Sequence, residues 1–598
     1  MPNAPTLQER RKAAIVKLDT FLRDECGGVR IPDQAIGRFE KRNFVAGWRL
    51  NVQPLWQVRQ IEVYVDGIFP FSAPRFVLVD GPRFLTWPHV EEDGMLCLGD
   101  ETQPVDASKP AEAAADLLVN MAYPLLRSCE VGSNREDFRG EFFSYWNRAV
   151  SDGTIVVRSL IDPRGPSRPV RIWRGKHFVV VGETDNQVLA WLKNLFGDQK
   201  HFDETEASCL LWLDRPPLPS EYPECALNVW QMATAVGASD LVFRSISKGR
   251  AAVSLIIGAM SDNGPCFGSV TVSKPATTSM FGRSVDQSER GFRPNRLPQQ
   301  LLARRLLNST TRVSRSRVER SDSSWIHGRD QDPRHAILKN CRVVMVGGGA
   351  IGAPVAIHLA MAGVGSLLIV DPENLTWSNV GRHPLGADSV GRGKASELAK
   401  RLRSSFPHGC FESRDETFES VLANQPELLR SSNLVVCATG IWSVESAINA
   451  WNCNENGPAQ VMYSWTEPHA VAGHAVAIRR GDACLQCQFY RDGDSKLIVT
   501  DWKDTDRRRE PACGAVYQPY GPVELSWTTA LASALALDCL LGQVTRSTHR
   551  IWAGPKALLD SAGGTWNKDW IGEKKERETG GFLEERIWVK DGACSICD

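Results

Sequence analysis

The sequence predicts a multidomain protein in which an α+β domain precedes two α/β domains. Its 598 residues are enough for roughly two to four domains, each with its own core. Near the N-terminus, short strands of alternating polarity lie between two helical stretches, which is typical of an α+β unit. Farther along, strand and helix signals alternate, which favours α/β domains. We therefore expect domains at 1–160, 161–335 and 336–598.

The composition is that of an ordinary globular protein. Hydrophobic residues make up 42% of the chain and charged residues 23%, with 70 basic side chains against 70 acidic ones. This balance gives no global attraction to nucleic acid or to an anionic membrane. The sequence has no apolar run of about 18 residues and no signal-peptide core. With sixteen cysteines and no secretion signal, we expect a cytoplasmic protein with reduced thiols.

The first domain, 1–160, begins with an amphipathic helix. Alternating polarity over 47–56, 60–71 and 74–81 predicts antiparallel strands, and a helical pattern follows at 109–129. Between them, Cys97 lies in a short apolar run just after a turn glycine. From these residues alone, Cys97 is either a core side chain or a nucleophile at the exit of a turn.

The second domain, 161–335, is predicted to be an α/β linker or partner-binding domain. A strand and then a helix are expected between Pro169 and Gly197, and further strands at 207–214 and 251–260. From Arg283 to Arg329 the chain becomes rich in arginine and serine. Because no aromatic stacking platform accompanies these arginines, a solvated connector is favoured over a nucleic-acid surface.

A glycine-rich turn marks the third domain, 336–598. A buried-type strand runs into Gly347, Gly349 and Gly352 at G-x-G-x-x-G spacing, and the next strand ends at Asp371. Such glycines let a phosphate approach the backbone at a helix N-terminus, and an acid at this distance can bind a ribose hydroxyl. The pattern predicts a Rossmann-like nucleotide site. By itself it also fits a dinucleotide-dependent oxidoreductase or a glycine turn without a ligand.

The residues after the second strand distinguish these alternatives. Asn379, Arg382 and Lys394 follow it, and fixed positive charge suits a triphosphate better than a nicotinamide. The combined pattern closely resembles the ubiquitin-activating E1 and ThiF/MoeB adenylation family. The resemblance implies that the three glycines shape an ATP loop, that Asp371 holds the ribose, and that Asn379, Arg382 and Lys394 contact the phosphates.

The sequence departs from this family at one position. Gly440 stands where the family usually carries an aspartate that assists magnesium-ATP, so the sequence names no carboxylate for Mg²⁺. The family also implies a homodimer built through the adenylation domains, in which an arginine is lent by the partner subunit. Arg329 and Arg334 are the candidates for that arginine.

Two C-x-x-C pairs offer four soft thiolates. Cys484 and Cys487 form the first pair, and Cys594 and Cys597 the second. Four thiolates are enough for a closed tetrahedral Zn²⁺ site, although redox or incidental thiols stay open as an alternative. ThiF- and MoeB-type enzymes close their C-terminal segment with two such pairs, so the resemblance implies a structural zinc.

Another cysteine, Cys513, lies between these pairs. It sits in a segment that we expect to be flexible, ahead of a long helix and near three arginines, a setting that can lower a thiol pKa. The segment resembles the crossover loop of E1-like enzymes, where the cysteine takes the acyl group as a thioester. An incidental loop thiol is the alternative.

The first domain resembles a ubiquitin-conjugating E2. Phe69-Pro70-Phe71 and the run Gly94 to Leu98 match E2 elements, and the run would make Cys97 the thioester cysteine. His89 stands eight residues before Cys97, where the family has an asparagine that supports the active-site loop or the oxyanion. An imidazole can donate a hydrogen bond to the same oxyanion, or His89 is only structural.

The whole architecture resembles the E1–E2 fusion proteins of bacterial CBASS anti-phage operons. The resemblance implies that ATP activates the C-terminus of a protein, a CD-NTase in that family. The acyl group would then move to Cys513, to Cys97 and finally to an amine. Three alternatives remain: an activating enzyme for a ubiquitin-like or sulfur-carrier protein, an NAD-dependent oxidoreductase, and a non-enzymatic nucleotide-binding scaffold.

Overall fold

The computed structural model describes residues 5–52, 60–99, 105–151, 153–248, 252–273, 307–454, 457–458, 460–503, 508–509, 516–517, 520–572 and 574–597. The chain forms two compact units. The first comprises Met1–Arg158, Asp162–Val181 and Glu206–Glu319, and the second Ser159–Ile161, Gly182–Thr205 and Arg320–Asp598. The division into three domains at 160/161 and 335/336 stays a prediction.

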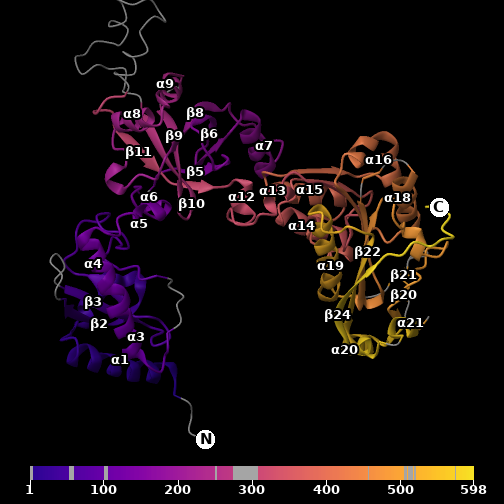
Figure 1. The fold of residues 1–598 in the computed structure, drawn as a ribbon, viewed down its shortest axis with the longest axis horizontal. Coiled ribbons are helices and arrows are strands. Elements are labelled where there is room, and N and C mark those ends of the chain that lie inside the picture. Colours follow the sequence, from indigo (N-terminus) through magenta and orange to yellow (C-terminus); the bar gives the residue numbers. More distant parts are fainter. Residues whose placement is uncertain are drawn as a thin grey trace, which may run out of the picture. The chain divides into compact units, whose positions relative to one another are not determined.

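The N-terminal part of the first unit is an antiparallel sheet packed on helices, as the sequence predicts (Figure 1). Thr6 and Glu9 form a capping box that starts α1, and the buried Leu18 and Leu22 of this helix join the core with Trp48 of the sheet. The elements are α1 (Leu7–Asp24), β1 (Val29–Arg30), α2 (Asp33–Ile36), β2 (Phe44–Asn51), β3 (Gln60–Asp66), β4 (Arg75–Leu78), α3 (Pro110–Asp116), a π-helical segment (Leu117–Ala122) and α4 (Tyr123–Val131).

The first unit also contains an eight-stranded mixed sheet in the order β11-β10-β9-β8-β6-β7-β5-β12. The strands that the sequence predicts at 207–214 and 251–260 are β8 and β9, and they pair in parallel. The elements are α5 (Asp137–Gly140), α6 (Phe142–Arg148), β5 (Val156–Ser159), β6 (Arg168–Arg174), β7 (Phe178–Gly182), β8 (Glu206–Leu213), α8 (Ala226–Ala235), α9 (Ser239–Lys248), β9 (Ala252–Ser261), β10 (Gly264–Ser273), β11 (Val313–Ser316) and β12 (Val318–Arg320).

Part of the arginine-rich stretch is folded, which corrects the expectation of a solvated connector. Residues 274–306 lie outside the described residues, but 313–316 form β11 and pair antiparallel with β10. Leu307 is buried in the same core. The sequence hid this strand because its pattern Val-Ser-Arg-Ser carries only one apolar side chain.

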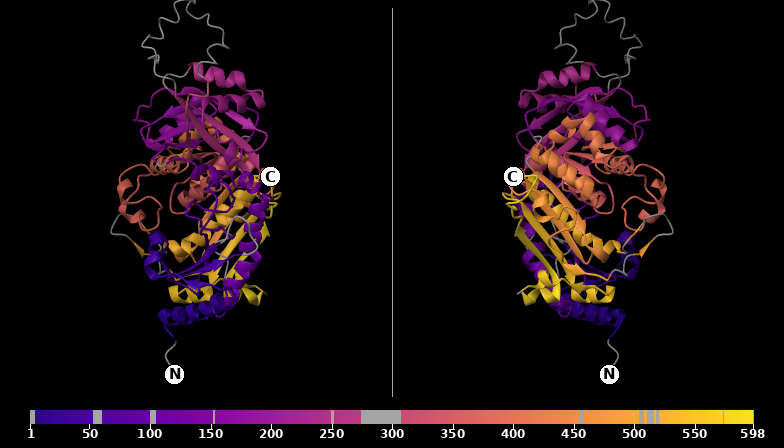
Figure 2. Two further views of the ribbon diagram at one scale, coloured as in Figure 1. Left: turned by 90° about the vertical axis from the view of Figure 1, so that its left-hand side faces the viewer. Right: turned by 90° about the vertical axis from the view of Figure 1, so that its right-hand side faces the viewer.

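The second unit is built on a sheet in the order β15-β14-β13-β16-β17-β18-β22-β24, whose first five strands run parallel. The edge strand β24 is the yellow strand in Figure 2. The strands are β13 (Arg342–Val346), β14 (Ser366–Val370), β15 (Cys410–Arg414), β16 (Leu434–Cys437), β17 (Gln460–Thr466), β18 (Ala472–Arg479), β22 (Thr548–Pro555) and β24 (Gly580–Ile587). The main helices are α7 (Asp185–Phe196), α12 (Ser323–Ile326), α13 (His335–Leu338), α14 (Gly352–Met361), α15 (Lys394–Ser405), α16 (Phe418–Asn424), α17 (Pro426–Arg430), α18 (Trp442–Asn454), α19 (Pro522–Leu540), α20 (Lys556–Ala562) and α21 (Lys568–Ile571).

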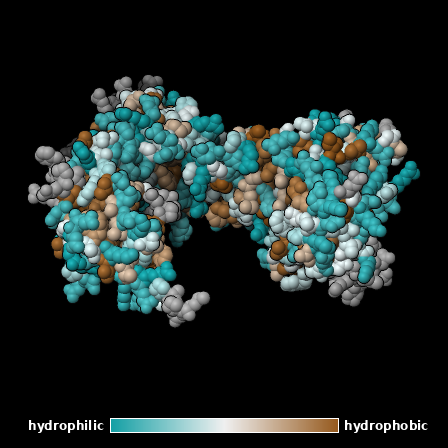
Figure 3. Space-filling model, turned by 60° about the horizontal axis from the view of Figure 1, so that its bottom comes forward, coloured by the Kyte–Doolittle hydropathy of each residue, from teal (hydrophilic) through white to brown (hydrophobic). Residues whose placement is uncertain are grey.

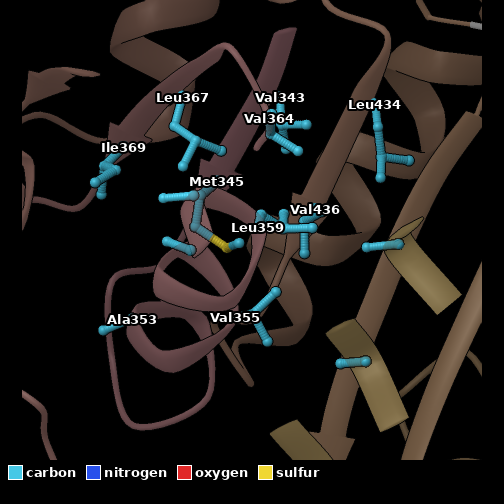
Figure 4. Close-up of a cluster of buried hydrophobic side chains, with 14 of the residues drawn as sticks. Val343, Met345, Ala353, Val355, Leu359, Val364, Leu367, Ile369, Leu434 and Val436 are labelled. Carbon is cyan, nitrogen blue, oxygen red and sulfur yellow. The ribbon is translucent and has the colours of Figure 1, made fainter. Parts of the chain in front are cut away.

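A large apolar core lies between this sheet and α14. Val343 and Met345 of β13 face Leu359 of α14, with Leu367 and Val436 from the neighbouring strands (Figure 4). Each is at most 1% exposed, and burial of one such side chain contributes about 1.5–3 kcal/mol. This packing fixes the carboxyl ends of β13, β14 and β16 at one edge of the sheet, where the loops that follow them meet.

The helix α19 is long and apolar enough to cross a membrane by length and composition. However, Leu531, Ala532 and Leu535 of this helix are buried in the core of the second unit. It is therefore a core helix of the second unit. The sequence did not predict a spanning run there because polar residues such as Glu524 and Asp538 interrupt the apolar ones. On the face shown in Figure 3, hydrophilic residues predominate and hydrophobic ones form small scattered groups.

Three histidines meet in the second unit next to α12 and α14. His327 donates from Nδ1 to the carbonyl of Met361 at 2.9 Å, so its Nε2 accepts from Nε2 of His408 at 2.7 Å. The ring of His335 stacks on His327 at 5.5 Å. Burial lowers the pKa of His327 and His335, and lowers that of His408 to about 3.

We expect these histidines to make the second unit acid-sensitive. Their folded-state pKa values lie below the unfolded value of 6.5, so the unfolded chain binds more protons and stability falls as pH drops from 6.5 toward 3. Each group that titrates costs about 1.4 kcal/mol per pH unit within its own window. Thermal unfolding at pH 8 and pH 5.5 measures the loss. His408→Gln should reduce it, and an unchanged loss would show that the cluster is not the cause.

Candidate active sites

Cys97 lies at the end of a buried bridge in the first unit. Met95 bridges to Val77 and Leu96 to Val90, and both Met95 and Leu96 are buried. Cys97 itself is exposed, and its backbone N–H donates to the carbonyl of His89 at 2.8 Å. The apolar run therefore anchors the segment through its first two residues and leaves the thiol accessible. This excludes the core alternative for Cys97.

His89 is held beside Cys97 in an unusual backbone conformation. Its φ is +59°, in the left-handed region, and its N–H donates to the hydroxyl of Tyr145 at 2.7 Å. Nε2 of the ring lies 3.0 Å from Oδ2 of Asp137, and Nδ1 lies 3.7 Å from Oε1 of Glu141. A hydrogen bond with the side chain of Cys97, together with the two acids, raises the pKa of His89 to about 9.

The site can stabilise negative charge next to the thiol. At neutral pH His89 is an imidazolium, since its pKa lies near 9, and both ring nitrogens then donate. Such a group favours an oxyanion that forms beside it. Sequence analysis missed Asp137, Glu141 and Tyr145, because they follow some 50 residues later and no motif marks them.

A pocket of about 440 Å³ opens between β4 and α3. Leu96 and Leu98, the chain neighbours of Cys97, line it together with Phe76. Arg75 and Lys109 add basic groups to this lining, and Asp106, Glu112 and Asp116 add acidic ones.

The glycine loop of the second unit has the conformation that its spacing predicts. Gly347 has a φ of +91°, and a Cβ on Gly352 would lie 1.8 Å from the carbonyl oxygen of Gly347. Neither position accepts a side chain. By contrast, a Cβ on Gly349 would meet no atom within 4 Å, so this glycine faces open space. The loop therefore leaves its backbone free at the N-terminus of α14, where an anion binds best.

Asp371 is joined to the glycine loop. Its Oδ2 accepts from the N–H of Gly348 at 2.7 Å, and its Oδ1 accepts from the N–H of Glu373 at 2.8 Å. The side chain is 6% exposed, and burial raises its pKa against these two bonds. Next to it, Nζ of the buried Lys394 pairs with Oε2 of Glu373 at 2.5 Å. Asp371 and Lys394 are thus brought to the same edge of the sheet.

Asn379 and Arg382 lie on the turn that follows. Oδ1 of Asn379 accepts from the N–H and hydroxyl of Thr376, and the guanidinium of Arg382 lies 5.4 Å from the centre of the Tyr520 ring. Sequence analysis missed His383 in the same turn, whose Nε2 donates to the carbonyl of Gly348 at 2.7 Å. This bond ties the turn that carries Asn379 and Arg382 to the glycine loop.

A buried acid, Glu445, contacts the loop at Gly440, where the sequence lacks the family's aspartate. Oε1 of Glu445 accepts from the N–H of Gly440 at 3.1 Å, and burial raises the pKa of Glu445 to about 7. The adjacent Thr439 also lies within contact distance of a Cβ on Gly347. The acid therefore reaches the loop beside the glycine turn from the first turn of α18. Its place on the next helix, outside the family's motif, hid it from sequence analysis.

The candidate lent arginines lie ahead of β13. Arg334 is exposed and pairs with Asp332 at 2.7 Å, and Arg329 has a φ of +51°. Their role toward a second subunit stays a prediction.

The four C-x-x-C thiols come together, although the pairs are far apart in the sequence. The sulfur of Cys484 lies 3.5 Å from that of Cys594, and the sulfur of Cys487 lies 3.4 Å from that of Cys597. All four sulfurs lie within 4.8 Å of one another. A tetrahedral Zn²⁺ with Zn–S bonds of about 2.3 Å needs sulfurs about 3.8 Å apart, so the donor set fits zinc.

Cys513 lies outside the described residues, so its environment stays a prediction. The chain that leads toward it is firmly attached. The N–H groups of Val499 and Thr500 each donate to the Glu467 carboxylate at 2.7 Å.

Two families match this chain. Residues 330–549 match the ThiF family, and residues 35–154 match prokaryotic E2 family B. The first match covers the glycine loop, Asp371 and Lys394, and the second covers Cys97 and His89. Both resemblances that the motifs indicate are thereby confirmed.

Several characterised proteins are similar in sequence. The ATP-dependent ubiquitin transferase-like protein Cap2 of Pseudomonas aeruginosa is 24% identical over 508 residues, covering 81% of this chain and 86% of that protein. A Cap2 of Escherichia coli is 28% identical over 234 residues, covering 37% of this chain and 38% of that protein. The ubiquitin-like modifier-activating enzyme 5 of Drosophila grimshawi is 24% identical over 255 residues, covering 39% of this chain and 61% of that protein. A crystal structure of E. coli MccB with ATP is 17% identical and covers 44% of this chain and 68% of that one, at a TM-score of 0.31 that supports no functional comparison.

Proposed function

We propose, on the premise that this chain is an E1–E2 fusion of a ThiF-family domain and a prokaryotic E2 family B domain, that it joins a protein C-terminus to an amine through thioesters. As an adenylating and conjugating enzyme, it would use ATP for the activation. The observation that carries the proposal is the exposed Cys97 beside His89, on the same chain as a nucleotide-type glycine loop.

The first step is activation of the carboxylate at the glycine loop. A carboxylate oxygen of the substrate attacks the α-phosphorus of ATP, the bond to pyrophosphate breaks, and an acyl adenylate forms. The loop from Gly347 to Gly352 would hold the phosphates and Asp371 the ribose. Arg382 and Lys394 supply the positive charge, and Asn379 a further polar contact.

Mg²⁺ would neutralise phosphate charge in this step when bound. Gly440 offers no side chain for it. Glu445, whose carboxylate contacts the Gly440 loop, is the acid that the fold provides there. Its pKa of about 7 means that it is partly ionised at neutral pH, and an approaching cation favours the ionised form.

The acyl group then passes between thiols. The Cys513 thiolate attacks the adenylate and releases AMP, and the Cys97 thiolate takes the acyl group from Cys513 in an exchange between similar thioesters. An amine attacks the carbonyl on Cys97, the C–S bond breaks, and the amine proton leaves to solvent. His89 donates a hydrogen bond to the oxyanion of this last step.

The partners follow from the similarity to Cap2 and the CBASS resemblance. We expect the activated protein to be a CD-NTase and the acceptor a protein amine. We further expect a cytoplasmic homodimer, in which Arg329 or Arg334 reaches the nucleotide of the other subunit.

We expect one zinc ion per chain at Cys484, Cys487, Cys594 and Cys597. Cys594→Ser removes one of four ligands and should abolish zinc in metal analysis and lower the Tm of the second unit by about 10 °C. Cys453 contacts Cys484 by a hydrogen bond without belonging to the four, so Cys453→Ser is the matched control and should retain the metal. A metal-free wild-type protein with unchanged stability would refute the zinc assignment.

Intact mass spectrometry tests the order of the two carriers. The protein is incubated with ATP and a CD-NTase, and adducts that disappear on addition of excess thiol are recorded. Cys513→Ala should abolish them at both cysteines, and Cys97→Ala should leave one on Cys513. Adducts that survive Cys513→Ala would overturn that assignment. Normal turnover in Cys97→Ala would favour a sulfur-carrier activating enzyme.

A further inference from the structure

The residues that hold His89 come from a segment with two faces. Asp137 opens α5, Glu141 lies between α5 and α6, and Tyr145 is on α6, each one helical turn from the next. All three touch His89, through Nε2, near Nδ1 and at the backbone N–H. The ring of Phe138 packs edge-on against Tyr145 at 4.7 Å and stiffens this face.

The opposite face of the same segment is part of the core of the eight-stranded sheet. Phe142 and Trp146 are buried among the side chains of β8, β9 and β10, and Nε1 of Trp146 donates to the carbonyl of Ser316 at 3.0 Å. Gly268 on β10 is required there, because a Cβ would lie 2.6 Å from the Trp146 ring. The seam between α6 and this sheet is therefore tightly packed.

Polar contacts fix α5 to the same part of the first unit. The guanidinium of Arg139 is 9% exposed, donates to the carbonyl of Pro216 and lies 3.4 Å from Glu221. Nδ2 of Asn263, in the turn between β9 and β10, donates to the carbonyl of Gly140 at 3.0 Å. None of these residues touches His89 or Cys97. They determine where the acids stand.

We propose that the eight-stranded sheet of the first unit is a working part of the conjugating site, because it holds α5 and α6 so that Asp137 and Glu141 face the two nitrogens of the His89 ring. Asp137, Glu141 and Tyr145 are positioning residues for His89. Arg139 and Glu221 act one step further away, because they hold α5 in place. The two carboxylates face the two ring nitrogens, and ionised carboxylates only accept hydrogen bonds. Only an imidazole that is protonated on both nitrogens can donate toward both carboxylates. The identity of the reaction rests on the proposed function.

The consequence is that the eight-stranded sheet sets the protonation state of His89 although it does not contact the His89 ring. The titratable groups that face His89 are Asp137, Glu141, Cys97 and, at the backbone, Tyr145. If α5 moves away, His89 loses two negative neighbours and releases its proton at a lower pH. The oxyanion then loses its charged donor. The eight-stranded sheet would thus control the last transfer without contacting the thioester.

The test loads Cys97 without ATP. A synthetic peptide thioester of a small thiol exchanges onto Cys97, the small thiol leaves, and the loaded chain is isolated. Discharge to hydroxylamine, which is unprotonated above pH 7, is followed by mass between pH 7 and 10, with spontaneous hydrolysis subtracted. Because no adenylation is involved, a failure of the proposed ATP chemistry leaves this test unaffected.

In the wild type, discharge should stay constant at the lower pH values and fall as His89 loses its proton. Because the Cys97 sulfur is acylated in the loaded chain, its hydrogen bond, the largest cause of the raised pKa of His89, is absent, and Asp137 and Glu141 hold the pKa up. Asp137→Asn and Glu141→Gln should each slow discharge at pH 8 by about tenfold or more and move the fall to lower pH. Arg139→Met and Glu221→Gln should also move the fall in discharge to lower pH, by a smaller amount. Asp33→Asn, an exposed acid of the same domain, should match the wild type.

Two results would overturn the proposal. An unshifted profile in Asp137→Asn would show that the acids do not set the state of His89. A shifted profile in Asp137→Asn with wild-type profiles in both Arg139→Met and Glu221→Gln would show that the eight-stranded sheet has no part in setting the protonation of His89. Glu221 is half exposed, so Glu221→Gln keeps the test valid even if Arg139→Met fails to fold.

Discussion

Cys97→Ser should lower conjugation to an amine by about a thousandfold or more, while each chain still releases AMP once in the presence of ATP. A serine hydroxyl is a far weaker nucleophile than a thiolate, and the imidazolium of His89 cannot ionise it. The acyl group should then accumulate on the preceding carrier. Conjugate formation on denaturing gels and AMP release measured in parallel separate the two effects.

Cys410→Ser is the matched control for this prediction. Cys410 is also exposed, but it lies on the edge strand β15 of the second unit. Its replacement should leave conjugation unchanged. Equal losses in both variants would mean that thiol replacement in general, and not the site at Cys97, is responsible.

Gly352→Ala should abolish nucleotide binding, with Kd raised by about a hundredfold or more. Its methyl group would lie 1.8 Å from the carbonyl oxygen of Gly347, which is backbone and cannot rotate away. The start of α14 must shift, so the N–H groups that face the phosphates move with it. Calorimetry with ATP measures the loss, and Tm reports the strain.

Gly349→Ala tests the same loop from its open side. The added methyl meets no protein atom within 4 Å, so Tm should hold while ATP affinity falls because the methyl enters the space of the phosphates. An unchanged affinity in Gly349→Ala would place the phosphates elsewhere.

The glycine loop could be predicted from sequence because its chemistry is local. Strand, glycines, helix and Asp371 follow one another within one βαβ unit, and the backbone around Gly347 and Gly352 excludes a side chain at both positions. The four thiols were predicted from their spacing in pairs, although the distance between the pairs carries no information about contact. The structure brings all four sulfurs within 4.8 Å of one another in the second unit.

The surroundings of Cys97 could not be predicted in the same way. The sequence places His89 near Cys97 through one short turn, but Asp137 and Tyr145 arrive from helices beyond α4. Only the packing of α6 on another sheet decides that these side chains face the turn. Glu445 is a similar case, since a helical turn, and not the strand-loop motif, brings it to Gly440. Non-local packing thus supplied the residues that motifs left out.

The central claim is that one chain activates an acyl group and carries it to Cys97. The most direct measurement is a single turnover of the wild-type protein with labelled ATP and a CD-NTase, in which AMP release and the mass of the Cys97 peptide are followed together. The account predicts one thiol-sensitive acyl group on Cys97 for each AMP released, before any amide appears. AMP release with an unmodified Cys97, or bound ATP without AMP release, would contradict it.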